Sequence, residues 1–383
     1  MVKNARRSAK MSTISNEDIE KIEHLIFSLQ HSEFYAQQII HTHHFSSHDA
    51  IYAEPKYELH PQLKTKLLEL GIKQLFSHQS LAFDYAKQSK DFVITTGTGS
   101  GKTLCFNLPV IDGLLLEPNA HAIYLFPTKS LAQDQLEKVR LLLPEGINAN
   151  VYDGDTPSGL RAKMRKNTHI FLTNPDMLHV GILPNHAIWA KTFKSLRYIV
   201  LDELHAYSGI FGSHVAHVIY RLLRLCEKYG SKPQIFSASA TIRNSAELFK
   251  QLTSRDPVVI NKDASESGWK CFIIWNPPEF TADERKSTNW ETAEIVFNLV
   301  KQNAKTLAFC QSRIAAEITR KYTEKNLEEH DKNLKEKIDS YRGGTHLKKG
   351  AKSNKNYFQE NFLRSFPQMQ WSWEWTWDIS TQL

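Results

Sequence analysis

The sequence has few cysteines and no long hydrophobic run, and each shortage excludes a class of protein. Its four cysteines (Cys105, Cys226, Cys271 and Cys310) lie far apart and form no Cys-x-x-Cys pair. This spacing argues against a zinc site and a disulfide framework, and it suits a reducing cytoplasm. No apolar stretch is long enough to cross a membrane. The charged residues 1–10 lack the apolar run of a secretion signal. We therefore expect a cytoplasmic protein with no membrane partner.

The composition predicts a globular chain of more than one domain. With 383 residues, 41% hydrophobic and 23% charged, the chain exceeds one ordinary domain and is not disordered. Its net charge of +7 is compatible with nucleic-acid binding. Charge alone favours this interpretation no more than it favours solvated basic faces.

Short apolar, β-rich runs alternate with amphipathic helical segments from residue 59 to residue 262. The runs are residues 122–126, 170–173, 198–201, 235–238 and 258–260, and helical patterns such as 131–142 and 215–228 lie between them. This alternation predicts an α/β fold with a parallel sheet covered by helices on both faces. In such folds ligands gather at the carboxyl ends of the strands.

The flanking regions predict smaller elements. Residues 1–58 read as a basic extension with a helix over 18–40, followed by a solvated loop that contains His41, His43, His44 and His48. Residues 263–268 read as a linker. After it we expect a strand at 271–275, a helix at 290–301, a strand at 306–310 and a helix at 313–327.

A phosphate-binding loop is the strongest motif of the chain. An apolar run ends at residue 94, and a helical run begins at residue 104. Between them lie Thr96, Gly97, Thr98, Gly99, Ser100, Gly101, Lys102 and Thr103. Glycines let backbone N–H groups close around phosphates, the lysine reaches the β- and γ-phosphates, and Thr103 would hold Mg²⁺. Thr96 departs from the pattern, which requires glycine there.

Two further motifs suit hydrolysis and its coupling. Asp202 and Glu203 follow an apolar run directly, so Asp202 would hold Mg²⁺ and Glu203 would act as base on the attacking water. Ser239-Ala240-Thr241 follows another run. We expect His205, Ser239 and Thr241 to couple hydrolysis to domain closure. The alternative for Ser239 and Thr241 is ordinary helix capping.

Three weaker motifs are candidates for base and strand contacts. The amide of Gln79 in Phe76-Ser77-His78-Gln79 offers the donor and acceptor that an adenine edge needs. Two segments begin helices after strands and suit nucleic-acid phosphates. Their residues are Pro127, Thr128 and Lys129, and Thr173, Asn174 and Pro175. Helix capping explains either segment equally well.

Together, and in this order, the motifs resemble superfamily 2 helicases of the DEAD/DEAH-box class over residues 59 to 344. The closest resemblance is to the RecQ-like repair helicases of the YprA/MrfA group. It rests on Ser77-His78-Gln79, Tyr152-Asp153-Gly154-Asp155-Thr156, Trp275-Asn276-Pro277-Pro278, and Asp202-Glu203-Leu204-His205 with Tyr207. The group more often has Val where this chain has Leu204. The resemblance implies a RecA-like ATP-binding domain (59–262), a second RecA-like domain from residue 263, and ATP-driven 3′-to-5′ movement on single-stranded or tailed DNA in repair.

The resemblance stops at Gly344, so the second domain (263–344) would be incomplete. Trp371, Trp373, Trp375 and Trp377 alternate closely in the tail, which an aromatic strand would explain. Met and Trp have single codons, and the partly forced residues of the shifted frame resemble the family's next motif, Thr-Asn-Ala-Leu-Glu-Leu-Gly-Ile-Asp. We therefore hypothesise a slip of the reading frame after Gly344. The tail 345–383 would be out of frame, leaving ATP and DNA binding with slow turnover and little unwinding.

Two other functions stay open at this point. One is a nucleotide-dependent clamp on nucleic acid without helicase activity. The other is a P-loop ATPase that acts on protein partners, against which the helicase-like order of the motifs argues. The motifs do not distinguish DNA from RNA, so DNA rests on the resemblance.

Overall fold

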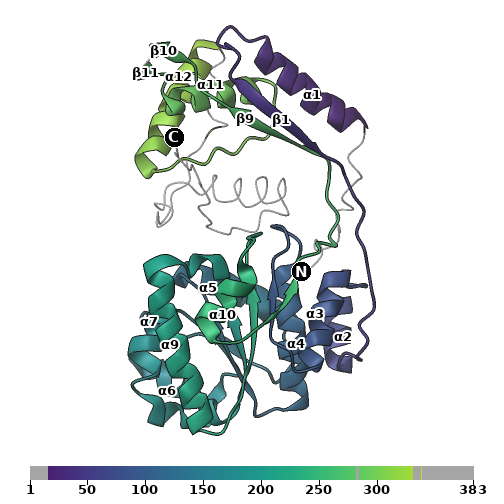
Figure 1. Cartoon of the computed structure of the whole chain (residues 1–383), viewed down its shortest axis with the longest axis vertical. Helices are drawn as coiled ribbons and strands as arrows, with labels where there is room; N and C mark the ends of the chain where they lie inside the picture. Colours follow the sequence, from purple (N-terminus) through teal and green to yellow (C-terminus); the bar gives the residue numbers. More distant parts are fainter. Residues whose placement is uncertain (1–15, 282–283, 331–337, 339–383) are drawn as a thin grey trace, which may run out of the picture. The chain divides into compact units, whose positions relative to one another are not determined.

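The computed structural model describes residues 16–281, 284–330 and 338. These residues form two compact units, which are described separately (Figure 1). Residues 49–266 make one uninterrupted stretch, here called the continuous unit. Residues 16–48 and 267–330 come from the two sides of that stretch and make the split unit. The tail 345–383, and with it the hypothesis of a shifted reading frame, lies outside the described residues.

The continuous unit is built on a seven-stranded parallel sheet with strand order β4-β5-β3-β6-β7-β2-β8. Its strands are β2 (Phe92–Ile94), β3 (His121–Leu125), β4 (Ala149–Val151), β5 (Ile170–Thr173), β6 (Leu196–Leu201), β7 (Gln234–Ala238) and β8 (Val258–Ile260). The predicted parallel α/β fold is confirmed, and only β4 was not expected. This strand has three residues with a central asparagine, too short and too polar to give a periodic signal.

Helices cover both faces of this sheet because most of its strands are apolar on both sides. One face packs against α2 (Pro61–Glu69), α3 (Ser77–Lys87), α4 (Lys102–Leu116) and α5 (Lys129–Leu142). The other packs against the π-helical turn η1 (Leu178–Ile182), α8 (Ala190–Lys194), α9 (Gly209–Lys228) and α10 (Ser245–Thr253). Figure 1 shows α3 and α4 on one side and α9 on the other. The remaining elements are α6 (Ser158–Asn167), α7 (Pro175–Met177), η2 (His186–Trp189) and η3 (Leu204–Ala206).

The split unit joins the N-terminal segment to residues beyond 267. Strand β1 (Ile39–Phe45) pairs antiparallel with β9 (Lys270–Trp275), with Phe45 opposite Lys270 and His43 opposite Phe272. Its other elements are α1 (Asn16–Gln30), β10 (Glu279–Thr281), β11 (Glu284–Arg285), α11 (Thr288–Lys301) and α12 (Arg313–His330).

Three expectations for the split unit are wrong. His41, His43 and His44 lie on a strand rather than in a loop, because a partner more than 200 residues away supplies the hydrogen bonds. The N-terminal helix ends at Gln30 instead of extending to residue 40. Residues 306–310 belong to no strand, since a strand needs a hydrogen-bonding neighbour and the described residues provide none there.

Two further expectations concerned the cysteines and the membrane-spanning segments. All four cysteines are free thiols. Within the described ranges, no helix combines the length and the apolarity that a membrane crossing requires.

Candidate active site

The candidate site residues gather at the carboxyl edge of the sheet. Strands β6, β7, β2 and β8 are consecutive neighbours, and all four run parallel. Asp202 therefore follows β6, Ser239 follows β7, and the phosphate loop follows β2, side by side at one edge. Segments that are about 40 to 140 residues apart in sequence are thus brought together by strand order alone.

The phosphate loop connects β2 to the first turn of α4. Gly99 and Gly101 have φ of +83° and +80°, in the left-handed region that favours glycine. The Lys102 Nζ donates to the carbonyl oxygens of Thr96 and Gly97, each at 3.0 Å. Thr96, which departs from the usual glycine, is buried, and its hydroxyl lies 2.6 Å from that of Ser100. The threonine at position 96 therefore links the start of the loop to Ser100 through their hydroxyl groups.

Asp202 and Glu203 form the acidic part of the site. Asp202 is buried, and its Oδ1 accepts from the backbone N–H of Glu203 at 3.0 Å. Glu203 has φ of +54°, a conformation that costs a non-glycine residue about 1 kcal/mol or more. The packed strand ends hold this strained backbone in place.

His205 connects the acidic motif to the segment after β7. Its Nδ1 accepts from the backbone N–H of Ala240 at 3.3 Å and lies 3.4 Å from Ser239 Oγ. The same nitrogen is 3.7 Å from Glu203 Oε2. Thr241, predicted to act with Ser239, is exposed. The structure thus brings together Glu203, His205 and Ser239.

Two buried or half-buried groups lie near the acids. Tyr207 was named only as part of a family motif, and Lys138 was missed at the level of sequence. Burial lowers the pKa of Lys138 on α5, which faces Asp134, Asp202 and Glu203. Tyr207 is fully buried, and burial, with Asp202 and Glu203 adding to it, raises its pKa well above the ordinary value. Lys138 lies in the middle of a helical pattern, which gives no signal of its role.

Gln79 lies against the phosphate loop. Its Nε2 donates to Gly101 O at 3.2 Å, and its Oε1 accepts from the N–H of Phe76 at 3.0 Å. The amide therefore ties the start of α3 to the loop, and its contact with adenine stays a prediction.

The predicted DNA-binding residues lie just after β3 and at or just after the end of β5, and these two strands are neighbours in the sheet. Thr128 caps α5 by accepting from Leu131 N at 3.3 Å, and Asn174 caps α7 by accepting from Met177 N at 2.8 Å. The Thr173 hydroxyl is buried and donates to Tyr152 O at 2.6 Å. The exposed Lys129 ammonium donates to both carboxylate oxygens of Asp155 at 2.9 Å. Pro127 and Pro175 flank the two caps.

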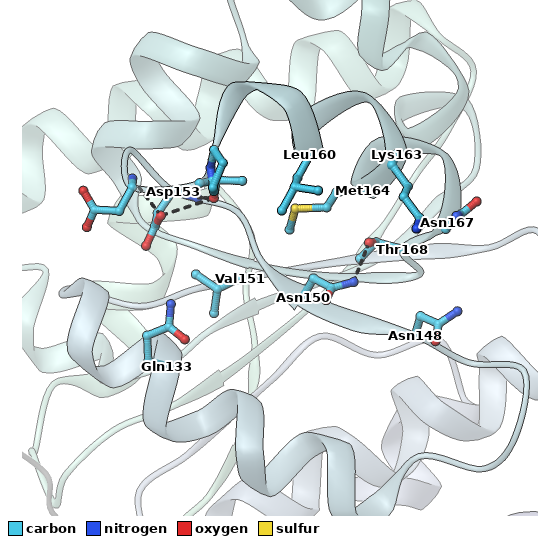
Figure 2. A pocket seen from close by; sticks show the side chains of 13 residues that line it. Gln133, Asn148, Asn150, Val151, Asp153, Leu160, Lys163, Met164, Asn167 and Thr168 are labelled. Atoms are coloured by element: carbon cyan, nitrogen blue, oxygen red, sulfur yellow. Dashed lines mark hydrogen bonds between the residues drawn. The ribbon is translucent and has the colours of Figure 1, made fainter.

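A groove of about 590 Å³ lies between α5, β4 and α6, five strands along the sheet from the phosphate loop (Figure 2). Asn148, Asn150, Lys163 and Met164 are among its lining residues. None of the residues that line it belongs to the phosphate loop or the acidic motif. The predicted chemistry therefore does not lie in this groove.

Comparison with known proteins identifies the domain that carries these motifs. The family model described as DEAD/DEAH box helicase matches residues 76–249. This chain contains a DEAD/DEAH box helicase domain. The match begins at the Phe76-Ser77-His78-Gln79 motif and ends in α10, so the helicase domain spans every candidate residue above.

Similar proteins extend the comparison beyond the helicase domain. The chain is 41% identical over 287 residues to the uncharacterized ATP-dependent helicase YprA of Bacillus subtilis, covering 74% of this chain and 38% of YprA. It is 39% identical over 375 residues to the ATP-dependent helicase HRQ1 of Saccharomyces cerevisiae, covering 94% and 34%. The crystal structure of the DUF1998 helicase MrfA bound to DNA matches with a TM-score of 0.79 at 37% identity, over 88% of this chain and 48% of MrfA.

These findings confirm the resemblance to the YprA/MrfA group and the RecA-like fold expected from it. The chain spans about a third of the length of the curated relatives that it matches.

The helicase domain fits a nucleoside triphosphate with Mg²⁺. A Cβ on Gly97 would lie 2.9 Å from Asp263 Oδ2, and one on Gly101 would lie 2.5 Å from Gln79 Nε2, so a side chain at either point would displace the group that contacts the loop there. Thr103 and Asp202 supply the hard oxygen atoms that Mg²⁺ prefers. Among the described residues, no group of three or more His, Cys, Asp or Glu is placed to hold a metal.

Proposed function

We propose that this chain is a cytoplasmic ATP-dependent DNA helicase of the repair type that moves 3′-to-5′ on single-stranded or tailed DNA. The observation that carries the proposal is the meeting of Lys102, Glu203 and the His205–Ser239 contact at one edge of one sheet. The relatives support the choice of nucleic acid, since MrfA is described as bound to DNA, and in a second structure to DNA and AMPPNP. The free thiols suit a reducing compartment.

The nucleotide would lie against the loop between β2 and α4. Bound ATP with Mg²⁺ supplies a reactive γ-phosphoryl group whose charge the cation partly neutralises. Lys102 would bind the β- and γ-phosphates, and the N-terminus of α4 would add its positive end. Thr103 and Asp202 would hold the cation, and Gln79 would contact adenine.

Glu203 would take the proton from the water that attacks the γ-phosphate. Its position after a packed strand keeps the carboxylate fixed, which general-base catalysis requires. The His205 ring, within 3.7 Å of Glu203 and 3.4 Å of Ser239, would report the state of the nucleotide to the segment 239–241.

A DNA strand would be held by backbone contacts that do not depend on sequence. Lys129 is the exposed cation of the set, and Asp155 holds it in an ion pair. Such exposed pairs are weak, so a DNA phosphate can replace Asp155 at little cost. Because the Thr173 hydroxyl is buried, it would influence DNA binding only by fixing the conformation of its own segment.

We also propose that residues 59–262 form the ATP-binding half of a motor and that residues 263–344 begin its second half. The N-terminal residues 1–58 would serve as an extension of this motor. The out-of-frame origin of 345–383 is tested by sequencing the gene beyond the codon of Gly344. One uninterrupted frame through that region contradicts it.

The proposal is tested by measuring ATP hydrolysis with and without single-stranded DNA. We expect DNA to stimulate turnover. Glu203→Gln should lower kcat by about 10²- to 10⁴-fold while leaving nucleotide binding intact, because it removes only the base. Glu227→Gln, on the exposed face of α9, is the matched control and should behave as the unchanged chain.

The same assay, with a measurement of DNA affinity at several ATP concentrations beside it, separates the other functions. If ATP raises DNA affinity without turnover, the chain is a nucleotide-dependent clamp. If turnover proceeds but ignores DNA, the chain is a P-loop ATPase with another kind of partner. Either result contradicts the helicase proposal.

A further inference from the structure

Residues just after β8 are linked to the phosphate loop at two points, directly through Asp263 and indirectly through His78. At the first point, Asp263 Oδ2 accepts from the backbone N–H of Gly97 at 2.9 Å. The other carboxylate oxygen, Oδ1, accepts from the N–H and the hydroxyl of Ser265 at 2.9 and 2.7 Å. Burial by itself raises the pKa of Asp263, but the hydrogen bonds from Ser265 and Gly97 outweigh it and hold the pKa below its ordinary value. The carboxylate is therefore charged at neutral pH.

The second point is made by His78, which is buried at the start of α3. Its Nδ1 accepts from the backbone N–H of Ala264 at 3.2 Å. Since Nδ1 is an acceptor, the ring proton lies on Nε2, which is 3.0 Å from Ser100 O and donates to it. Burial lowers the pKa of His78, which keeps this neutral form. None of the helicase roles proposed above involves His78, although this residue belongs to the Phe76-Ser77-His78-Gln79 motif.

The peptide group between Thr96 and Gly97 lies between two opposite charges. Its oxygen accepts from the Lys102 ammonium at 3.0 Å, and its N–H donates to the Asp263 carboxylate at 2.9 Å. A cation at the oxygen and an anion at the N–H polarise the peptide in the same sense, so each hydrogen bond strengthens the other. Anything that moves the Lys102 ammonium away weakens the bond to Asp263.

Asp263 is also placed to pass such a change along the chain. Residues 263–266 are the last of the continuous unit, and the chain enters the split unit at Ser267. Because β8 pairs with β2, the segment after β8 is the immediate neighbour of the loop after β2. The contact is therefore built into the sheet order.

We propose that Asp263 and His78 are positioning residues that hold the phosphate loop in its nucleotide-free shape and relay nucleotide binding to residues 263–266. The inference rests on the proposed ATP-binding function and adds a route to it. When phosphates draw Lys102 away from Thr96 O, the Thr96–Gly97 peptide loses its cation, and the Asp263 carboxylate faces the added negative charge. Its bond to Gly97 weakens, and the segment that leads to the split unit is released.

The test uses the full chain with Asp263→Ala, Asp263→Asn and the control Asp256→Asn. Asp256 precedes β8, is exposed and pairs only on the surface with Lys250. We expect Asp263→Ala to lower the KM for ATP about tenfold, because nucleotide binding then no longer has to weaken the bond between Asp263 and Gly97 or bring phosphates towards a carboxylate. We expect kcat at saturating ATP, without DNA, to change less than about twofold, because Asp263 contacts no reacting group. Asp263→Asn keeps the size and one acceptor but loses the charge, so its KM should lie between the two.

Hydrogen exchange of residues 261–267, with and without AMPPNP, provides the readout that a purely structural role would not affect. In the unchanged chain and in Asp256→Asn, AMPPNP should speed exchange in this segment. In both Asp263 variants the difference should disappear. The proposal is overturned if the difference persists in Asp263→Asn, or if this variant has the unchanged KM. A failure of the unchanged chain to bind AMPPNP contradicts the proposed function itself, and is seen before any variant is compared.

Discussion

The two units of this chain differ in how completely their sheets are buried. In the continuous unit, all residues of β2, β3 and β5 are buried, because helices cover both faces. In the split unit, six of the seven residues of β1 are exposed, and β9 alternates between exposed and half-buried positions. Ile40 and Phe272 are 62% and 53% exposed. Apolar burial therefore stabilises the first unit far more than the second.

The difference explains where the candidate active site lies. Strained positions such as Glu203, with φ of +54°, persist only where the surrounding packing fixes them. The covered sheet supplies that packing, whereas the two-stranded sheet does not. A two-stranded sheet is marginal by itself and depends on the segments that join it.

Deleting residues 1–48 should have the largest effect, because it should remove the structure of the exposed sheet and leave the buried sheet intact. It removes β1, which is the only strand paired with β9 in the described part of the chain. We expect amide protection at 270–275 to fall to that of an unstructured peptide, while protection at 92–94 is kept. Hydrogen exchange measures both. His43→Thr, which keeps the strand, is the control, and retained protection of β9 after the deletion would contradict the pairing.

The same substitution, phenylalanine to alanine, can be made in the sheet of each unit and its effect on stability compared. Phe236 is fully buried and stacks on Phe92 with ring centroids 4.3 Å apart. Phe236→Ala should lower the free energy of unfolding by about 3–5 kcal/mol, because it leaves a cavity in a packed core. Phe272→Ala, on β9, should change it by less than about 0.5 kcal/mol. Urea denaturation measures both, and equal effects would show that the two sheets are buried alike.

Glu291 on α11 tests whether the split unit has a fixed interior of its own. Its side chain is buried, and Oε2 accepts from Trp275 Nε1 at 2.8 Å while Oε1 lies 3.3 Å from Lys286 Nζ. Glu291→Gln should cost about 1–3 kcal/mol, because the cation loses its partner. The change should appear in tryptophan fluorescence during unfolding. Glu329→Gln, exposed on α12, should leave that transition unchanged, and an equal shift in both would assign the effect to surface charge.

The most gradual of the expected effects is an acid sensitivity confined to the continuous unit. Burial lowers the pKa of His121 to about 4, and the nearby His169 and Lys191 add to the shift. Since the unfolded chain binds this proton at about pH 6.5, stability should fall as pH drops from about 6.5 towards 4, by at most about 1.4 kcal/mol per pH unit. His121→Gln should flatten this slope. Unfolding at several pH values measures it, and an unchanged slope would exclude His121 as the cause.

Much of the continuous unit was predictable from sequence because its signals are local. Apolar runs gave six of its seven strands within one or two residues of their observed bounds, and polar residues at their ends gave the candidate site. The left-handed Glu203 and the half-buried Lys138 were not predictable, since both depend on neighbours distant in sequence. Asp263 was assigned to a linker, although it closely follows a strand end, where the same rule would have placed it at the site. The pairing of β1 with β9 has no local signal at all.

The hydrogen bond from Ile51 N to Ala264 O, at 2.9 Å, shows that the chain enters and leaves the continuous unit at adjacent points. The continuous unit is thus an insertion within the chain of the split unit, as domains with neighbouring termini allow. During synthesis on the ribosome, β1 is completed about 225 residues before β9 begins, counted from Phe45 to Lys270. At usual synthesis rates this is a delay of about 10–50 s. During that time β1 has no strand to pair with, while the inserted unit can already fold.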